Sequence, residues 1–208
     1  MNKLKIILMM CMFMISFISV NAVTDLETDI LGCWDFETDD GDEALDYYNI
    51  HNGSNINSPT VVSGKINNAY YFYGGQQVNI DDTTKDFSTF KNLTIAYWVN
   101  YTTLQGAVLD KGYTSSGCLS GGGCNPYRAG EMSAVAENFG SYSAGYVYGW
   151  KVITYKVFAF NKWSHVIMNW NNTHITLYVN NTQVGQNTFS GQIDANTQPL
   201  NFGAYWND

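Results

Sequence analysis

The chain has few basic residues and few charged residues of any kind. Only 10 of its 208 residues are Lys or Arg, against 18 that are Asp or Glu, so the formal net charge is −8. Nucleic-acid binding requires clustered Lys and Arg, and this composition excludes it. Ten of the eighteen acidic residues lie between Asp25 and Asp46. Carboxylates at this density are ligands available to a hard cation such as calcium.

Long helical patterns are absent as well. Ala, Leu, Glu and Lys never gather at a 3.6-residue spacing over a long window, whereas aromatic and β-branched residues form short runs interrupted by Gly and Asn. This arrangement is typical of an all-β domain. The clearest run is HITLYV at 174–179, followed by Asn180-Asn181, which tolerate the positive φ of a two-residue turn. We expect the polar side chains of this hairpin to meet solvent and its aliphatic side chains to face a core, namely Ile175, Leu177 and Val179.

Similar runs predict about a dozen short strands without internal repeats or a domain-splitting linker. The expected fold is a jelly-roll sandwich of two antiparallel sheets. We expect Trp34, Trp98, Leu177 and Val179 to meet in its interior. The predicted strands are 30–36, 69–73, 78–80, 93–99, 107–109, 132–136, 146–150, 152–160, 163–170, the hairpin and 200–204.

Only one long hydrophobic run occurs. Lys3 and Lys5 precede an apolar stretch from 6 to 20, and Ala22 supplies a small residue for cleavage. This is the layout of a secretory signal peptide at 1–22, and it is shorter than the roughly 20 apolar residues of a spanning helix. An uncleaved anchor is the alternative. We expect an acidic leader at 23–29, a domain at 30–208, and an exported protein, extracellular or at the cell surface, with no membrane span after cleavage.

Cysteine is scarce, with four residues, and Cys11 belongs to the signal segment. Cys118 and Cys124 flank the glycine-rich stretch CLSGGGC, and in an oxidising compartment we expect them to form a disulfide. Cys33 remains, and we expect it to be a small buried apolar residue.

Eight segments, taken together and in order, resemble laminin-G-like jelly-roll domains of the concanavalin A-like lectin/glucanase superfamily. Asn68 and Asn181 stand where such domains often have Gly, and both residues tolerate left-handed backbone. The usual last strand, of the form G-x-I-D-E-x-R-I-Y, does not appear. We therefore expect the domain at 30–208 to be C-terminally incomplete, with further sequence in a longer chain or a strand from another chain. The segments are LGCWDFE at 31–37, Asp46 with Asn52-Gly53, GKINNAYYFYG at 64–74, LTIAYWV at 93–99, DKG at 110–112, WSHV at 163–166, LYVN at 177–180 and LNFGA at 200–204.

The resemblance raises two chemical expectations. Many such sandwiches hold one structural calcium ion, and here Asp35 or Glu37 would match its first ligand. The superfamily also includes retaining glycosidases with an E-x-D-x-x-E strand, whose catalytic carboxyl groups lie about 5–5.5 Å apart. Glu131 and Glu137 lack the central Asp, and on a single strand they would lie about 20 Å apart. We therefore expect no enzyme activity. His165, in WSHV, reads as a structural histidine beside a Trp.

Recognition is the remaining function. Tyr146, Tyr148 and Trp150 share one face of a predicted strand, and such a row stacks on sugar rings or, alternatively, fills the core. The loop 112–130, which contains Tyr127 and Arg128, is a second candidate binding site. The alternative is that it is only a connection held by the expected disulfide. We expect a secreted, non-catalytic module that binds carbohydrate or a surface partner within a larger protein. A degenerate or partial glycoside hydrolase and a purely structural adhesin domain remain the alternatives.

Overall fold

The computed structural model describes residues 29–37, 41–87, 90, 92–102, 107–111, 127–133, 136–141, 151–155, 160–171, 173–188 and 197–204. The chain divides into two compact units, Met1–Cys33 and Trp34–Asp208. All described strands lie in the second unit.

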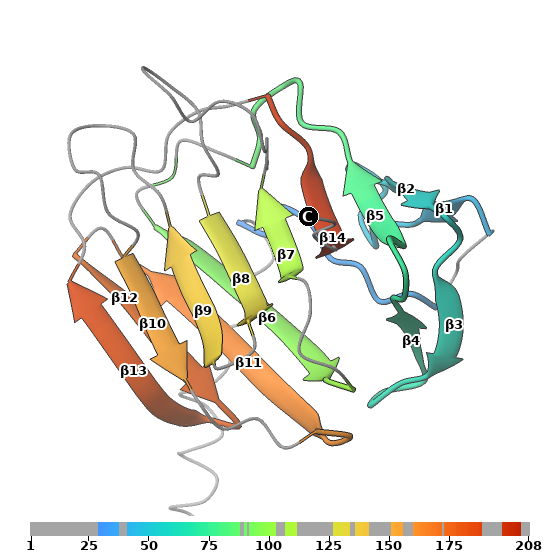
Figure 1. The fold of residues 1–208 in the computed structure, drawn as a ribbon. Helices are drawn as coiled ribbons and strands as arrows, with labels where there is room; N and C mark the ends of the chain where they lie inside the picture. Colours follow the sequence, from blue (N-terminus) through green and yellow to red (C-terminus); the bar gives the residue numbers. More distant parts are fainter. Residues whose placement is uncertain are drawn as a thin grey trace, which may run out of the picture. The chain divides into compact units, whose positions relative to one another are not determined.

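Within these residues the second unit is built from fourteen strands (Figure 1). None of the described residues belongs to a helix that is long and apolar enough to span a membrane. The strands are β1 (Glu43–Ala44), β2 (Gly53–Ile56), β3 (Thr60–Ser63), β4 (Asn68–Tyr71), β5 (Gln77–Ile80), β6 (Leu93–Asn100), β7 (Ala107–Lys111), β8 (Tyr127–Ser133), β9 (Ala136–Ser141), β10 (Lys151–Tyr155), β11 (Trp163–Trp170), β12 (His174–Val179), β13 (Thr182–Thr188) and β14 (Leu200–Ala204).

The described strands form three sheets. The largest has eight strands in the order β1-β2-β5-β14-β7-β8-β9-β10, the second has four in the order β13-β12-β11-β6, and β3 pairs with β4. Each strand pair is antiparallel. In Figure 1 the strands β7 to β10 form one layer and the four-stranded sheet forms a second layer behind them. The predicted all-β sandwich of antiparallel sheets is confirmed.

The four-stranded sheet follows the period of two that its sequence predicts. On β11 the side chains of Val166, Met168 and Trp170 are buried, and their neighbours alternate with them as half-buried residues. On β12 the predicted aliphatic face is buried, because Ile175 and Leu177 are 0% exposed and Val179 is 7% exposed. Full burial of one such side chain stabilises the fold by about 1.5–3 kcal/mol. These residues form the core on this side of the sandwich.

The turn of the β12–β13 hairpin also matches its prediction. Asn180 and Asn181 have φ values of 48° and 65°. The polar face differs in one respect, because Thr176 is 6% exposed although we expected it to meet solvent. Gln186 on β13 covers it and donates a hydrogen bond from Nε2 to Thr176 Oγ1 at 3.3 Å. A polar residue next to a long amide side chain on the neighbouring strand is thus buried without losing its hydrogen bond.

The predicted first strand, 30–36, is wrong. Its residues form no ladder, and Phe36 has a φ of 59°, which is incompatible with a continuous strand. Trp34 instead donates a hydrogen bond to the carbonyl oxygen of His51 at 3.0 Å, and its ring packs edge-on against Phe202 at 4.9 Å. The segment therefore joins the core through aromatic side chains rather than through backbone pairing. Cys33, predicted to be buried, is exposed.

Two strands that the sequence did not predict, β1 and β2, flank a turn organised by Asp46. Its side chain is buried, and its carboxylate accepts backbone N–H groups from Ile50 and His51, both at 3.2 Å. Asn52 Oδ1 accepts the backbone N–H of Asp46 at 3.1 Å. A Cβ atom at Gly53 would overlap the Val78 side chain, so β2 can approach β5 only with glycine there. This geometry explains the Asp46 and Asn52-Gly53 motif.

The predicted strand 132–136 is wrong, because these positions span the end of β8 and the start of β9. Of the predicted strand 152–160, residues 152–155 lie in β10 and 156–159 lie outside the described residues. The remaining predicted strands agree with the structure apart from their ends. Thr60–Ser63 forms β3, which was not predicted. β8 begins at Tyr127 rather than at 132, and the chain then pairs back on itself as β9. Residues 146–150 lie outside the described residues.

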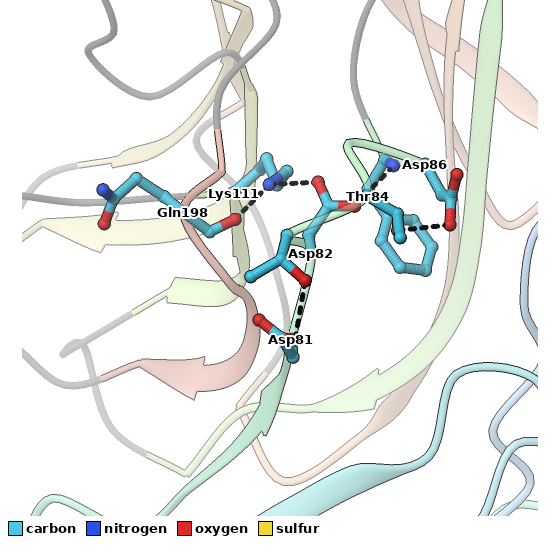
Figure 2. A network of polar contacts seen from close by, with 8 residues as sticks. Asp81, Asp82, Thr84, Asp86, Lys111 and Gln198 are labelled. Carbon is cyan, nitrogen blue, oxygen red and sulfur yellow. Dashed lines mark hydrogen bonds and ion pairs between the residues drawn. The ribbon is translucent and has the colours of Figure 1, made fainter.

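A buried ion pair connects β7 with the turn after β5 (Figure 2). Lys111 Nζ lies 2.5 Å from Asp82 Oδ2, and both side chains are fully buried. Lys111 also donates a hydrogen bond to the carbonyl oxygen of Gln198, just before β14, and Asp82 Oδ1 accepts the backbone N–H of Phe87 at 3.2 Å. Burial lowers the pKa of the Lys111 ammonium below its ordinary value, and the hydrogen bond and charge of Asp82 offset part of that effect. The lysine of the DKG motif thus joins three segments.

Removing one member of this pair should be strongly destabilising. We expect Lys111→Met to lower the free energy of unfolding by about 3–5 kcal/mol, because Asp82 would remain buried without its counter-charge. The double variant Lys111→Met/Asp82→Leu should recover most of this loss, because it removes both charges. Chemical denaturation monitored by tryptophan fluorescence measures each value. Lys85→Met, which alters an exposed lysine in the neighbouring turn, is the control; a loss in the double variant as large as in the single variant would contradict the argument.

Candidate functional site

Trp98 lies on the outer face of the four-stranded sheet, not in the core. Its side chain is 41% exposed, so the prediction that it meets Trp34, Leu177 and Val179 in the interior is wrong. On β6 the exposed residues are Thr94, Ala96 and Trp98, and their neighbours Leu93, Ile95, Tyr97 and Val99 are more buried. The inward set is uniformly apolar, and this alternation is the signal that would have placed Trp98 outside.

Trp98 holds two other side chains on this face. The ring of His165, its partner in the β6–β11 register, packs against the indole with centroids 5.0 Å apart and an interplanar angle of 34°. Lys65, in the turn between β3 and β4, places its Nζ 5.4 Å from the indole centroid. The tryptophan beside the His165 ring is thus Trp98 of the neighbouring strand. We call Lys65, Trp98 and His165 the cationic cluster.

Next to the cationic cluster, β11, β12 and β13 form an open hollow of about 430 Å³. Four of its lining side chains are carboxamides, each with a donor and an acceptor, and Ile167 and Tyr178 add apolar surface. The lining residues are Ile167, Asn169, Asn171, Thr176, Tyr178, Asn181 and Gln186. We call this set the amide hollow. The sequence does not predict this hollow, because its residues come from three strands and the adjoining turns.

Hydrogen bonds orient several of these amides. Asn169 Nδ2 donates to Thr94 Oγ1 at 3.1 Å, and Gln186 Nε2 donates to Thr176. Asn171 Oδ1 accepts the backbone N–H groups of Thr173 and His174 at 3.2 and 2.9 Å. Within the described part of the chain, the side-chain oxygens of Asn169 and Gln186 and the side-chain nitrogen of Asn171 make no further hydrogen bond. These atoms are available to a ligand.

The face carries no carboxylate from its strands. The sequences of β6, β11, β12 and β13 contain no Asp, Glu, Lys or Arg, and the chain has no acidic residue from 138 to 193. Most glycoside hydrolases require a pair of carboxyl groups about the scissile bond. These four strands do not supply one.

The glutamates considered for catalysis are arranged differently from the prediction. Glu131 and Glu137 lie on neighbouring strands, β8 and β9, and not about 20 Å apart along one strand. The register pairs Glu131 with Asn138 and Met132 with Glu137. Residues directly opposite each other share a face, so the two glutamate positions lie on opposite faces of the sheet. The arrangement on a single strand is therefore wrong for these two glutamates.

The predicted calcium ligands both hold backbone groups. Asp35 Oδ1 accepts the N–H of Glu37 at 3.0 Å, and Glu37 Oε1 accepts the N–H of Asn68 at 3.0 Å. The described residues contain no group of three or more His, Cys, Asp or Glu side chains placed to hold a metal ion. The calcium ion that the family resemblance implies stays a prediction.

The remaining site predictions lie wholly or partly beyond the described residues. Tyr146, Tyr148, Trp150, Cys118 and Cys124 are outside them, so the aromatic row and the disulfide stay predictions. The backbones of Tyr127 and Arg128 begin β8, opposite Lys111 and Asp110 of β7. Their role in binding also stays a prediction.

Comparison with known proteins agrees with this architecture. A family model described as the concanavalin A-like lectin/glucanases superfamily, of the laminin-G type, matches residues 72–208. The chain belongs to this superfamily. The resemblance inferred from the eight sequence segments is thereby confirmed, whereas a search of the curated proteins found no match.

Solved structures show the same fold at low sequence identity. Domain 4 of AbnA, a GH43 extracellular arabinanase from Geobacillus stearothermophilus solved in complex with arabinotriose, is 14% identical, with a TM-score of 0.59 over 78% of this chain and 79% of that one. An HCR/D mutant is 12% identical, with a TM-score of 0.56 over 84% of this chain and 42% of that one. The HCR/D-Sa-GBL1/C structure is 14% identical, with a TM-score of 0.52 over 83% and 42%.

Two tryptophans of the four-stranded sheet should differ sharply in their contribution to stability. We expect Trp170→Ala, at a side chain that is 1% exposed, to lower the free energy of unfolding by about 3–5 kcal/mol. Trp98→Ala should cost about 1 kcal/mol, because it removes ring contacts at an exposed site. Urea denaturation of both variants tests the assignment of faces. Equal losses would contradict it.

Proposed function

We propose that this protein is a non-catalytic carbohydrate-binding module and that the amide hollow is its binding site. The observation that supports this proposal is the composition of the hollow, in which four carboxamides and a threonine hydroxyl surround the apolar surface of Ile167 and Tyr178. Small-molecule sites typically combine an apolar surface with a few convergent polar groups.

Sugars suit this arrangement for two reasons. A sugar ring carries neighbouring hydroxyl groups that donate and accept at once, and a carboxamide offers both functions in one plane. The C–H face of the ring is apolar and packs against an aromatic side chain such as Tyr178. A volume of about 430 Å³ lies within the usual range of ligand sites, about 300–1,000 Å³.

The absence of carboxylates on the surrounding strands supports binding without hydrolysis. A partial or degenerate glycoside hydrolase would need a carboxyl pair from elsewhere in the molecule. The structurally similar domain of AbnA belongs to an arabinanase and was solved with arabinotriose. That complex supports a glycan as the ligand class. The alternative, a purely structural adhesin domain, would not require a hollow lined by polar groups.

The sequence supports an extracellular setting for this activity. We place the protein outside the cell or on its surface, because residues 1–22 have the layout of a secretory signal peptide. A module of this kind would bring a larger adhesive or polysaccharide-processing protein to its glycan.

Removing the aromatic surface of the hollow should weaken glycan binding. We expect Tyr178→Ala to reduce affinity by about 1–3 kcal/mol, the range found for other stacking contacts, without abolishing the fold. A glycan array followed by calorimetry on the strongest ligand measures the loss. Tyr73→Ala, at a side chain that is 74% exposed on another part of the molecule, is the matched control.

The same measurement distinguishes the competing readings. Unchanged affinity in a folded Tyr178→Ala protein would refute the amide hollow, and a loss in Trp150→Ala instead would move the site to the predicted aromatic row. Reducing sugar released from the bound glycan would establish hydrolysis. The absence of any glycan ligand would favour the purely structural role.

A further inference from the structure

We propose that the glycan is anionic and that Lys65 binds its carboxylate or sulfate group while a neighbouring sugar unit occupies the amide hollow. This inference rests on the proposed function and adds the class of ligand. It makes Lys65 a specificity-determining residue, and Trp98 the positioning residue that holds the lysine in place.

The amide hollow and the cationic cluster lie next to each other on one face. His165 and Ile167 are separated by two positions on β11, which corresponds to about 7 Å along a strand. The turn of the β12–β13 hairpin joins the two sites as well. The backbone N–H of Asn180 donates to the carbonyl oxygen of His165 at 2.8 Å, and Asn180 Oδ1 accepts the N–H of His165 at 2.9 Å. Because Asn181 lines the hollow, an oligosaccharide leaving it at this end passes the cationic cluster.

Lys65 is an exposed lysine in the turn between β3 and β4. Within the described part of the chain it forms no ion pair, and its contact there is with the indole of Trp98. The neighbouring acid, Glu37, uses its carboxylate to accept the N–H of Asn68 in the same hairpin. A lysine that lies over an indole keeps its ammonium group hydrated on the other side, where an anionic group can displace water. Trp98 therefore holds the lysine side chain over its ring and does not offer that ring to a ligand as an uncovered stacking surface.

The charge distribution permits an anionic ligand despite the net charge of −8. The eighteen acidic residues are absent from the four strands of this face and from the whole segment 138–193. At physiological salt the screening length is about 8 Å, so a cation in contact with the ligand outweighs carboxylates further away. Among neutral and acidic glycans of similar shape, this face should prefer the acidic ones.

The test compares the full-length mature protein with five variants on matched ligands. The probes are an oligogalacturonate and its carboxyl-reduced form, a chondroitin sulfate oligosaccharide and its desulfated form, and a neutral arabino-oligosaccharide. The variants are Lys65→Gln, Lys65→Arg, Trp98→Leu, Tyr178→Ala and, as a control for net charge, Lys85→Gln. Calorimetry gives affinities, and thermal melting confirms that each variant is folded.

We expect the wild type to bind an acidic probe about 3- to 10-fold more tightly than its neutralised form. Lys65→Gln should abolish this preference while leaving the neutral probe unaffected, Lys65→Arg should keep it, and Lys85→Gln should change nothing. Raising the salt concentration from about 0.05 M to about 0.5 M should remove most of the preference. Trp98→Leu should reduce it selectively, a result that a merely structural role would not produce. Whether carboxyl reduction or desulfation has the larger effect identifies the anionic group.

Two results would overturn the inference, and they differ in whether the proposed glycan binding is refuted as well. Equal binding of acidic and neutral probes, lost in Tyr178→Ala but not in Lys65→Gln, would refute the anionic ligand and leave glycan binding intact. A failure of all the probes to bind would refute the proposed function along with this inference.

Discussion

The burial of one face of the four-stranded sheet determines what its other face presents. Side chains on a strand alternate, so once Val166, Met168 and Trp170 are buried in the core, His165 and Ile167 must point outward. A register shift of one residue would exchange the two sets and expose the core, so the register of this sheet is strongly specified. The burial of core residues, which do not contact a ligand, therefore determines which residues form the outer face.

Close contacts between the backbone of one strand and side chains of another stabilise the rest of the sandwich. They also explain several sequence motifs. Gly203 has a φ of 71°, and any side chain there would overlap the ring of Phe72, so the glycine of LNFGA lets β14 lie against that ring. Gly53 plays the same part between β2 and β5. Lys111 and Asp82 add a polar connection inside the fold, where a misplaced charge would be very costly. These positions resist substitution for steric or electrostatic reasons, and none of them lines the amide hollow.

How much of this the sequence could predict depends on which interaction formed each element. Strands β11 and β12 were predictable because apolar alternation alone stabilises them. The pair β1–β2 was not, since it depends on Asp46 accepting backbone N–H groups, a local polar pattern that resembles a loop. Trp98 was misplaced because Tyr97 and Trp98 are both aromatic, and only the alternation with Ile95 and Val99 distinguishes inside from outside.

The candidate site was beyond sequence reasoning for a different reason. The amide hollow draws on three strands, and Lys65 and Trp98 are 33 positions apart, so neither site has a pattern along the chain. What the sequence does record is the distribution of charge. Four acidic residues of the first half accept backbone N–H groups, namely Asp35, Glu37, Asp46 and Asp82. Carboxylates fixed in that way shape loops outside the four strands, and the outer face of these strands carries amide, hydroxyl, aromatic and aliphatic side chains without an acidic residue. Because these four strands carry no carboxylate, we propose that the single positive charge of Lys65 selects the sign of the ligand.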